Sequence, residues 1–259
     1  MGTILFDRVI FGPVKSRRLG NSLGINLLPN DSKLCNYNCI YCECGWTFHS
    51  HQSRKRFHSV LTVLNSLEEK LGSMKNLGES PDNITFAGNG EPTLHPNFPE
   101  IIAGVIELRN EYFPDAKIAV LSNGTMIQKD KIYEALTRVD KNMLKLDTAI
   151  DETYKILNSP PKDFKLTDLI KNLERFNGNF IIQTLFLTGL FDGKKINNTD
   201  TKELAAWIDM VSHLKPSMVH IYSLARETAS INLHPVPYEK LMEISNQLKA
   251  KSIHSYVFD

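Results

Sequence analysis

Long apolar runs and an excess of charge of either sign are both missing from this sequence of 259 residues. No apolar stretch approaches the roughly 18 residues that a helix needs to cross a bilayer, and no secretory apolar core is present. Thirty basic residues stand against 29 acidic ones, so the net charge of +1 creates no global field for nucleic acid. Internal repeats and low-complexity tracts are missing as well. We therefore expect one cytoplasmic domain over residues 1–259.

Cysteine is scarce, and all four cysteines fall within ten residues, at Cys35, Cys39, Cys42 and Cys44. A chain of this length has core enough without disulfides, so reduced thiols are expected. The first three follow the spacing Cys-x3-Cys-x2-Cys. Three thiolates from one tight loop can hold three irons of a 4Fe-4S cluster and leave the fourth iron open to a ligand. The alternative is a tetrahedral zinc site that only pins the loop.

Short β-rich runs alternate with helical patterns along the whole sequence. The predicted strands cover residues 23–28, 84–87, 118–121, 143–146, 180–187 and 218–222. Repeated strand and helix units with right-handed crossovers predict an α/β fold, either a doubly wound sheet or a closed or partial (β/α) barrel. In each of these architectures the functional site lies at the carboxyl ends of the strands.

Four chemically distinctive segments follow predicted strands. The cysteine loop follows the first strand, residues 88–92 the second, Ser122 and Asn123 the third, and Asp147 ends the fourth. In residues 88–92, glycines permit close backbone approach, and the Glu91 carboxylate can accept hydrogen bonds from an ammonium group. A simple turn is the alternative interpretation of that segment. We expect these segments to meet in one site.

The cysteine spacing together with the Glu91 loop resembles the radical S-adenosylmethionine (SAM) superfamily. In that family three cysteines, here Cys35, Cys39 and Cys42, ligate a 4Fe-4S cluster whose open iron binds the amino and carboxylate groups of SAM. The Gly-Gly-Glu loop holds the methionine ammonium. Its counterpart here is Gly88, Asn89, Gly90 and Glu91, with Asn89 in place of the commonest glycine. The resemblance implies a partial (β/α)6 TIM-like barrel.

The resemblance divides the chain into an N-terminal extension (1–22), a core (23–222) and a C-terminal strand and helix segment (223–259). Other positions resemble the segments with which the family binds SAM. Tyr41 occupies the aromatic position near adenine, and Asp147 the ribose position. The remaining ones are Ser122 and Asn123 near the methionine carboxylate and ribose, and Gln183 and Thr184 on the adenine side.

A narrower resemblance is carried by residues 11–20 (Phe-Gly-Pro-Val-Lys-Ser-Arg-Arg-Leu-Gly), 24–26, 42–45 and 221–226. These segments look like compact radical SAM proteins labelled as wyosine-type tRNA-modifying, or 4-demethylwyosine synthase-like, enzymes. Those synthases carry a second cluster on further cysteines, which this sequence does not have. Arg17, Arg18 and Arg226 could clamp a carboxylate or phosphate of SAM or substrate; ion pairs on the rim are the alternative.

The reaction implied by the resemblance is reductive. An electron from a flavodoxin- or ferredoxin-like donor cleaves SAM to methionine and a 5'-deoxyadenosyl radical, which removes a hydrogen atom from the substrate. Basic residues at 15–18 and 54–56 slightly favour tRNA or a nucleoside as that substrate. A peptide or protein, as for activating enzymes, is the second hypothesis, and a non-catalytic zinc-binding module the third.

Several side chains near these motifs have open roles. Cys44 is interpreted as a spare thiol, with a substrate contact or an extra ligand as alternatives. His49 and His51 follow the cysteine loop closely enough to approach the site. Lys145 either pairs with a carboxylate or forms a Schiff base with a carbonyl substrate.

Overall fold

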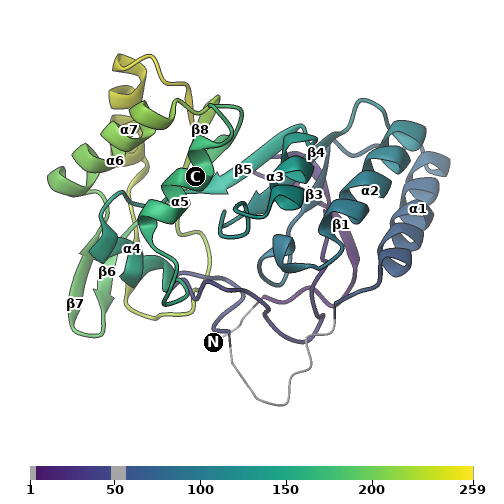
Figure 1. Cartoon of the computed structure of the whole chain (residues 1–259), viewed down its shortest axis with the longest axis horizontal. Helices are drawn as coiled ribbons and strands as arrows, with labels where there is room; N and C mark the ends of the chain where they lie inside the picture. The colour runs from purple at the N-terminus through teal and green to yellow at the C-terminus, as the bar shows by residue number, and fades with distance from the viewer. Residues whose placement is uncertain (1–3, 48–56, 259) are drawn as a thin grey trace.

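The computed structural model describes residues 4–47 and 57–258 (Figure 1). His49, His51 and the basic run at residues 54–56 lie outside these described residues. Within the described part, no helix is long and apolar enough to span a membrane.

The strands of the described residues form one sheet around which the fold is built. Their bounds are β1 Ile10–Ser16, β2 Gly20–Ile25, β3 Asn83–Phe86, β4 Lys117–Ser122, β5 Lys141–Lys145, β6 Ile181–Phe191, β7 Lys194–Asn197, β8 Met218–Ser223, β9 Leu233–Pro235 and β10 Ser255–Phe258. The order across the sheet is β1-β2-β3-β4-β5-β6-β8-β10, with β7 and β9 paired to β6. Strands β2 to β6 and β8 are parallel neighbours. This curled parallel sheet confirms the predicted α/β fold and partial barrel.

Helices cover the outer face of the sheet, and Figure 1 shows α1 and α2 beside one half of it and α6 and α7 beside the other. Their bounds are α1 Val60–Asn76, α2 Phe98–Tyr112, α3 Asp130–Thr137, α4 Asp151–Asn158, α5 Leu166–Glu174, α6 Thr201–Leu214 and α7 Tyr238–Ala250, with a short 3-10 turn at Pro92–Leu94. Helix α1 begins at Ser59, whose hydroxyl accepts a hydrogen bond from the backbone N–H of Thr62. It buries Val63, Leu67 and Leu71 against the main core, as helical spacing requires.

The inner face of the sheet carries a second, smaller apolar cluster. Leu19, in the turn between β1 and β2, packs there with Ala119 and Met143. That turn lies at the amino end of β2, so it fills the barrel from the end opposite the strand carboxyl ends. The polar residues that end the parallel strands are thereby left around a cavity at the other end.

Candidate active site

One cavity of about 280 Å³ gathers most of the predicted site residues. Those that line it are Cys35, Cys39, Tyr41, Cys42, Gly88, Gly90, Glu91, Ser122, Asn123 and Gln183. Residues not assigned to the site from the sequence line it too, among them Lys33, Tyr37, Lys145, Leu185 and Tyr222. The cavity also includes Arg18 and Cys44. Segments that are far apart in sequence therefore share one site, as expected from their positions after successive strands.

The cysteine loop and the glycine loop are joined directly. Leu34 donates its backbone N–H to the Asn89 carbonyl at 2.8 Å, and its own carbonyl accepts from the Glu91 N–H at 3.1 Å. A Cβ atom on Gly90 would come within 1.9 Å of the Leu34 carbonyl oxygen, and Gly90 has φ +138°. Only glycine permits this approach. The bridge sets Cys35 beside the loop that carries Glu91.

Glu91 presents a buried carboxylate to the cavity. Its Oε1 accepts from Ser122 Oγ at 2.8 Å and from both the backbone N–H and the hydroxyl of Thr93, while Oε2 accepts from the Asn123 backbone N–H at 2.7 Å. Burial raises the pKa of Glu91, and these hydrogen bonds oppose the rise. Oε2, with one such bond from the described residues, can accept another from a cationic ligand.

Asn89 does not line the cavity, and the structure gives it a different task. Its side chain is fully buried. Its Oδ1 accepts from the Phe6 backbone N–H at 2.8 Å, and its Nδ2 donates to the carbonyls of Phe6 and Pro29 at 2.9 and 2.7 Å. Asparagine therefore stands at the common glycine position because it ties the segment before β1 to the loop.

The thiols surround a buried ammonium group. Lys33 Nζ donates to the Gly45 carbonyl at 2.8 Å. Burial lowers the pKa of Lys33, but the charges of Cys42, Cys35 and Cys39 outweigh it and leave this pKa raised. A hydrogen bond from Cys44 and the nearby Lys33 charge lower the pKa of Cys42, whereas burial raises the pKa of Cys35 and of Cys39.

This donor set fits a thiolate-ligated cluster. Three soft sulfur donors line one cavity beside a cation that can balance thiolate charge. In a cluster each cysteine binds a different iron, so the three sulfurs need not surround one point. Accordingly, the described residues contain no group of three or more His, Cys, Asp or Glu side chains placed to hold a single metal ion. Cys44 donates to the Gly88 carbonyl at 3.5 Å.

Asp147 is buried and is not part of the cavity lining. Its Oδ2 accepts from the Tyr41 hydroxyl and from Asn158 Nδ2 at 2.8 Å, and lies 3.5 Å from Lys145 Nζ. Its Oδ1 accepts from the Leu185 backbone N–H at 3.0 Å. Both carboxylate oxygens are thus occupied. Asp147 thereby anchors Tyr41 and Lys145, and the ribose contact expected of it stays a prediction.

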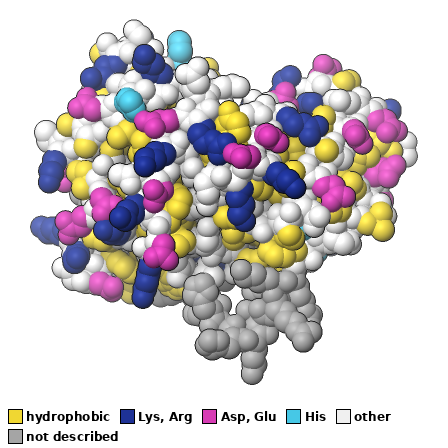
Figure 2. All heavy atoms as spheres, in the orientation of Figure 1, with side chains coloured by type: hydrophobic (Ala, Val, Ile, Leu, Met, Phe, Trp, Pro, Cys, Tyr) yellow, Lys and Arg dark blue, Asp and Glu magenta, His cyan; other side chains and the backbone are white. Residues whose placement is uncertain are grey.

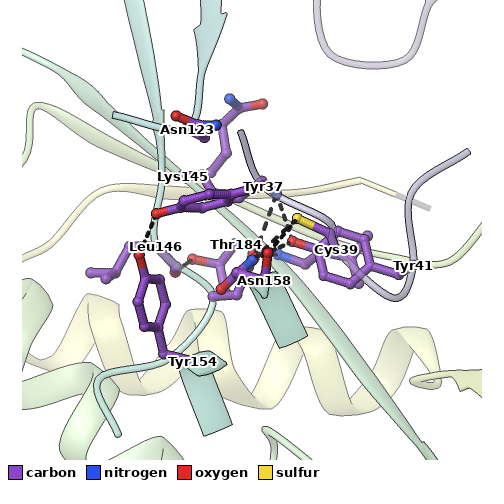
Figure 3. Close-up of polar contacts among 12 residues, drawn as sticks. Tyr37, Cys39, Tyr41, Asn123, Lys145, Leu146, Tyr154, Asn158 and Thr184 are labelled. Carbon is purple, nitrogen blue, oxygen red and sulfur yellow. Dashed lines mark hydrogen bonds and ion pairs between the residues drawn. The ribbon is translucent and has the colours of Figure 1, made fainter. Parts of the chain in front are cut away.

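Asn158, the last residue of α4, connects this network to the cysteine loop. Its Nδ2 also contacts Cys39 Sγ at 3.5 Å and the Tyr41 oxygen at 3.1 Å, and Figure 3 shows it beside both residues. Asn158 lies 119 positions after Cys39 in the sequence, so no local sequence pattern predicts this contact.

Two further predicted residues lie outside the cavity. Thr184 is fully buried and donates its hydroxyl to the Leu146 carbonyl at 2.7 Å. Arg226 forms an exposed ion pair with Glu43 at 2.9 Å, which corresponds to the rim alternative. Lys145 donates to the Tyr41 hydroxyl at 2.8 Å, so it adopts the carboxylate-paired arrangement.

A cavity that combines three thiols, a buried carboxylate and a glycine loop at the carboxyl ends of a partial barrel defines an enzyme that binds a metal cluster and a charged organic cofactor. The sequence pattern of the Radical SAM superfamily matches residues 30–208. The chain belongs to this superfamily. It is a radical SAM enzyme, and its cofactors are a 4Fe-4S cluster and SAM.

Among curated relatives, the chain is 28% identical over 247 residues to a UPF0026 protein of Methanocaldococcus jannaschii, covering 94% of this chain and 73% of that one. It is 31% identical over 225 residues to a protein named GTPase Obg from Brachyspira hyodysenteriae. That match covers 85% of this chain but only 30% of the relative.

Solved structures share the fold at low sequence identity. A radical SAM methyltransferase from Sphaerobacter thermophilus aligns with a TM-score of 0.67 at 16% identity, covering 91% of this chain and 65% of that chain. TYW1 with a lysine-pyruvate adduct gives 0.60 at 13%, covering 88% and 73%. Streptococcus suis SuiB bound to its precursor peptide gives 0.64 at 15%, covering 94% and 50%.

Proposed function

We propose that Cys35, Cys39 and Cys42 hold the cluster and that Glu91 receives the ammonium group of SAM. The observation that carries this proposal is the shared cavity, in which the three thiols and the Glu91 carboxylate stand on two loops joined through Leu34. When bound and reduced by a flavodoxin- or ferredoxin-like donor, the cluster supplies the electron that cleaves SAM to methionine and a 5'-deoxyadenosyl radical, which abstracts hydrogen from the substrate.

The chain's own residues hold the reactants and protect them. Ser122 and the backbone N–H of Asn123 fix the orientation of the Glu91 carboxylate. Tyr41, held by Asp147 and Lys145, forms part of the cavity wall. The lowered pKa of Cys42 favours the thiolate that metal binding requires, whereas Cys35 and Cys39 must release protons when the metal binds.

The substrate we favour is tRNA or a nucleoside, with a peptide or protein as the second candidate. The motifs that resemble wyosine-type enzymes and the fold shared with TYW1 support the first. The fold shared with peptide-bound SuiB supports the second. Lys15 and Arg17 are exposed on the β1 side and available to a phosphate backbone, but Figure 2 shows basic and acidic side chains interspersed over the visible face. Any RNA contact would therefore be local.

The test is anaerobic reconstitution with iron and sulfide, followed by SAM and dithionite and quantification of 5'-deoxyadenosine by mass spectrometry. We expect the wild-type chain and Cys44→Ala to form the nucleoside, and Cys39→Ala to lose both the cluster absorption and the product. Cys44→Ala is the matched control because Cys44 lies in the same loop and cavity. Undiminished product with Cys39→Ala would defeat the cluster assignment.

A further inference from the structure

Arg18 enters the cavity from the opposite end of the barrel. It belongs to the turn between β1 and β2, and its half-buried side chain reaches residues that point inward from β6 and β8. Its NH1 donates to Gln183 Oε1 at 2.8 Å, and its guanidinium carbon lies 4.4 Å from the centroid of the Tyr222 ring. A guanidinium thus forms one wall of the cavity.

The position of this guanidinium is held from several sides. Gln183 Nε2 donates to the Met143 carbonyl at 3.1 Å, which turns the amide oxygen toward Arg18. Ser16 Oγ accepts from the backbone N–H groups of Arg18 and Leu19 and so shapes the turn. Leu19 is buried in the inner apolar cluster. A planar donor fixed in this way loses little freedom when it binds a ligand.

Arg18 differs from the other cationic residues of the cavity, Lys33 and Lys145, in having no anionic partner among the described residues. Lys145 pairs with Asp147, and the Glu43 carboxylate pairs with Arg226. Lys33 lies beside the thiols. Arg18 takes part in no ion pair of the described residues, and only one of its five N–H donors is used by Gln183.

The contacts of Arg18 also separate it from Glu91, the residue expected to hold the ammonium group of SAM. Glu91 is held by Ser122 and Asn123, at the end of β4. Arg18 contacts β6 and β8, on the other side of β5 in the sheet order. An anion bound by Arg18 therefore lies across the cavity from Glu91 and next to Gln183, beyond the expected position of the SAM ammonium group.

We propose that the Arg18 guanidinium, stacked on Tyr222 and oriented by Gln183, recognises a carboxylate or phosphate group of the substrate. The proposal rests on the proposed function, because it takes the Glu91 side of the cavity as the SAM side. The proposal predicts that the substrate carries a negative charge. A neutral ligand would lose the charge-assisted hydrogen bonds that a guanidinium makes with a carboxylate or phosphate.

The test measures binding of inorganic phosphate and of acetate to the cluster-loaded chain by calorimetry, and of SAM by equilibrium dialysis. We expect Arg18→Gln to weaken phosphate or acetate binding by about tenfold to a hundredfold, the size of a charge-assisted hydrogen bond. Arg138→Gln, which removes an exposed charge outside the cavity lining, should change nothing. SAM affinity should stay at the wild-type value in both variants.

Two results would overturn the proposal. In the first, neither anion binds the wild-type chain more tightly than it binds Arg18→Gln. In the second, Arg18→Gln lowers the affinity for SAM instead, which would assign the guanidinium to the cofactor carboxylate. If Arg18→Gln does not fold by circular dichroism, Arg18→Lys replaces it. Lysine keeps the positive charge but lacks the planar guanidinium, so the affinity for phosphate or acetate should fall severalfold. Wild-type affinity in Arg18→Lys would also refute the proposed role of Arg18.

Failure of the proposed function gives a different pattern. No cluster or no 5'-deoxyadenosine from the wild-type chain would reject the cluster and SAM assignment. The anion titration of the metal-free chain, compared between Arg18→Gln and Arg138→Gln, would still report on the guanidinium.

Discussion

Apart from the thiol loop with Lys33, two sides of the cavity present opposite charges. On the side of β3 and β4, the Glu91 carboxylate faces the cavity and is held by neutral donors. On the side of β5, β6 and β8, the cationic residues Arg18 and Lys145 line the cavity. The Asp147 carboxylate does not line it, because it is bound to Asn158 and Lys145. A protein with a net charge of +1 can thus polarise one small site, which suits a ligand cation on one side and an anion on the other.

The largest effect is expected where the buried pair on the cationic side is broken. Asp147→Asn leaves the Lys145 charge without its partner, so unfolding free energy should fall by about 3–5 kcal/mol. Urea denaturation of the metal-free chain measures this loss.

The matched control is Asp151→Asn, which breaks the exposed pair with Lys155. This change should cost only about 0–0.5 kcal/mol. Equal losses in Asp147→Asn and Asp151→Asn would show that the network around Asp147 does not stabilise the fold.

A smaller effect is expected from Asn89→Ala on the Glu91 side. The substitution removes three hydrogen bonds to the backbone of Phe6 and Pro29, so stability should fall by about 1–3 kcal/mol. SAM affinity should be retained because Asn89 does not line the cavity. Asn97→Ala, which removes an exposed bond to Glu100, is the control. A loss of SAM binding without a loss of stability would return Asn89 to the cofactor contacts.

A comparable effect that depends on pH concerns His220, which lies on β8 opposite Gln183. Burial and the charges of Arg18 and Lys141 lower the pKa of His220 to about 4, from 6.5. Below pH 6.5 the unfolded chain binds a proton that the folded chain does not, so the folded state loses stability as the pH falls from 6.5 to 4. The loss should be about 2 kcal/mol.

Urea denaturation across that pH range measures the effect. His220→Gln should flatten the pH dependence, and the same change at exposed His234 should not. Arg18→Gln should raise the pKa of His220 and weaken the dependence. An unchanged profile for His220→Gln would place the titrating group elsewhere.

Periodicity was sufficient to predict the parallel core. The six predicted strands correspond to β2, β3, β4, β5, β6 and β8. Helix α1 buries Val63, Leu67, Leu71 and Met74 at helical spacing, with Val60 and Leu64 half-buried beside them. Strand β1 was missed because Gly12 and Pro13 and a shift in its register make it read as a loop. Strands β7, β9 and β10 were missed because they are short and mostly exposed or half-buried, whereas β3, as short as β7 and β10, is buried throughout.

The site was predictable only where it depends on local sequence. The cysteine spacing and the Glu91 loop are contiguous motifs, and the structure brings them together. The position of Thr184 outside the cavity was predictable from the sequence, because neighbouring residues of a strand face opposite sides and Gln183 faces the cavity. The roles of Asn158 and Asp147 depend on contacts across 119 and 106 positions of sequence, which no local pattern contains.

The most direct test of the polarised cavity is the SAM affinity of the cluster-loaded chain after single charge removals, measured by equilibrium dialysis. We predict that Glu91→Gln weakens SAM by about tenfold to a hundredfold with its iron content unchanged. Glu43→Gln, which removes an acidic group from the same lining, and Arg18→Gln should bind SAM as the wild type does. Wild-type affinity in Glu91→Gln, or an equal loss in all three variants, would contradict the account.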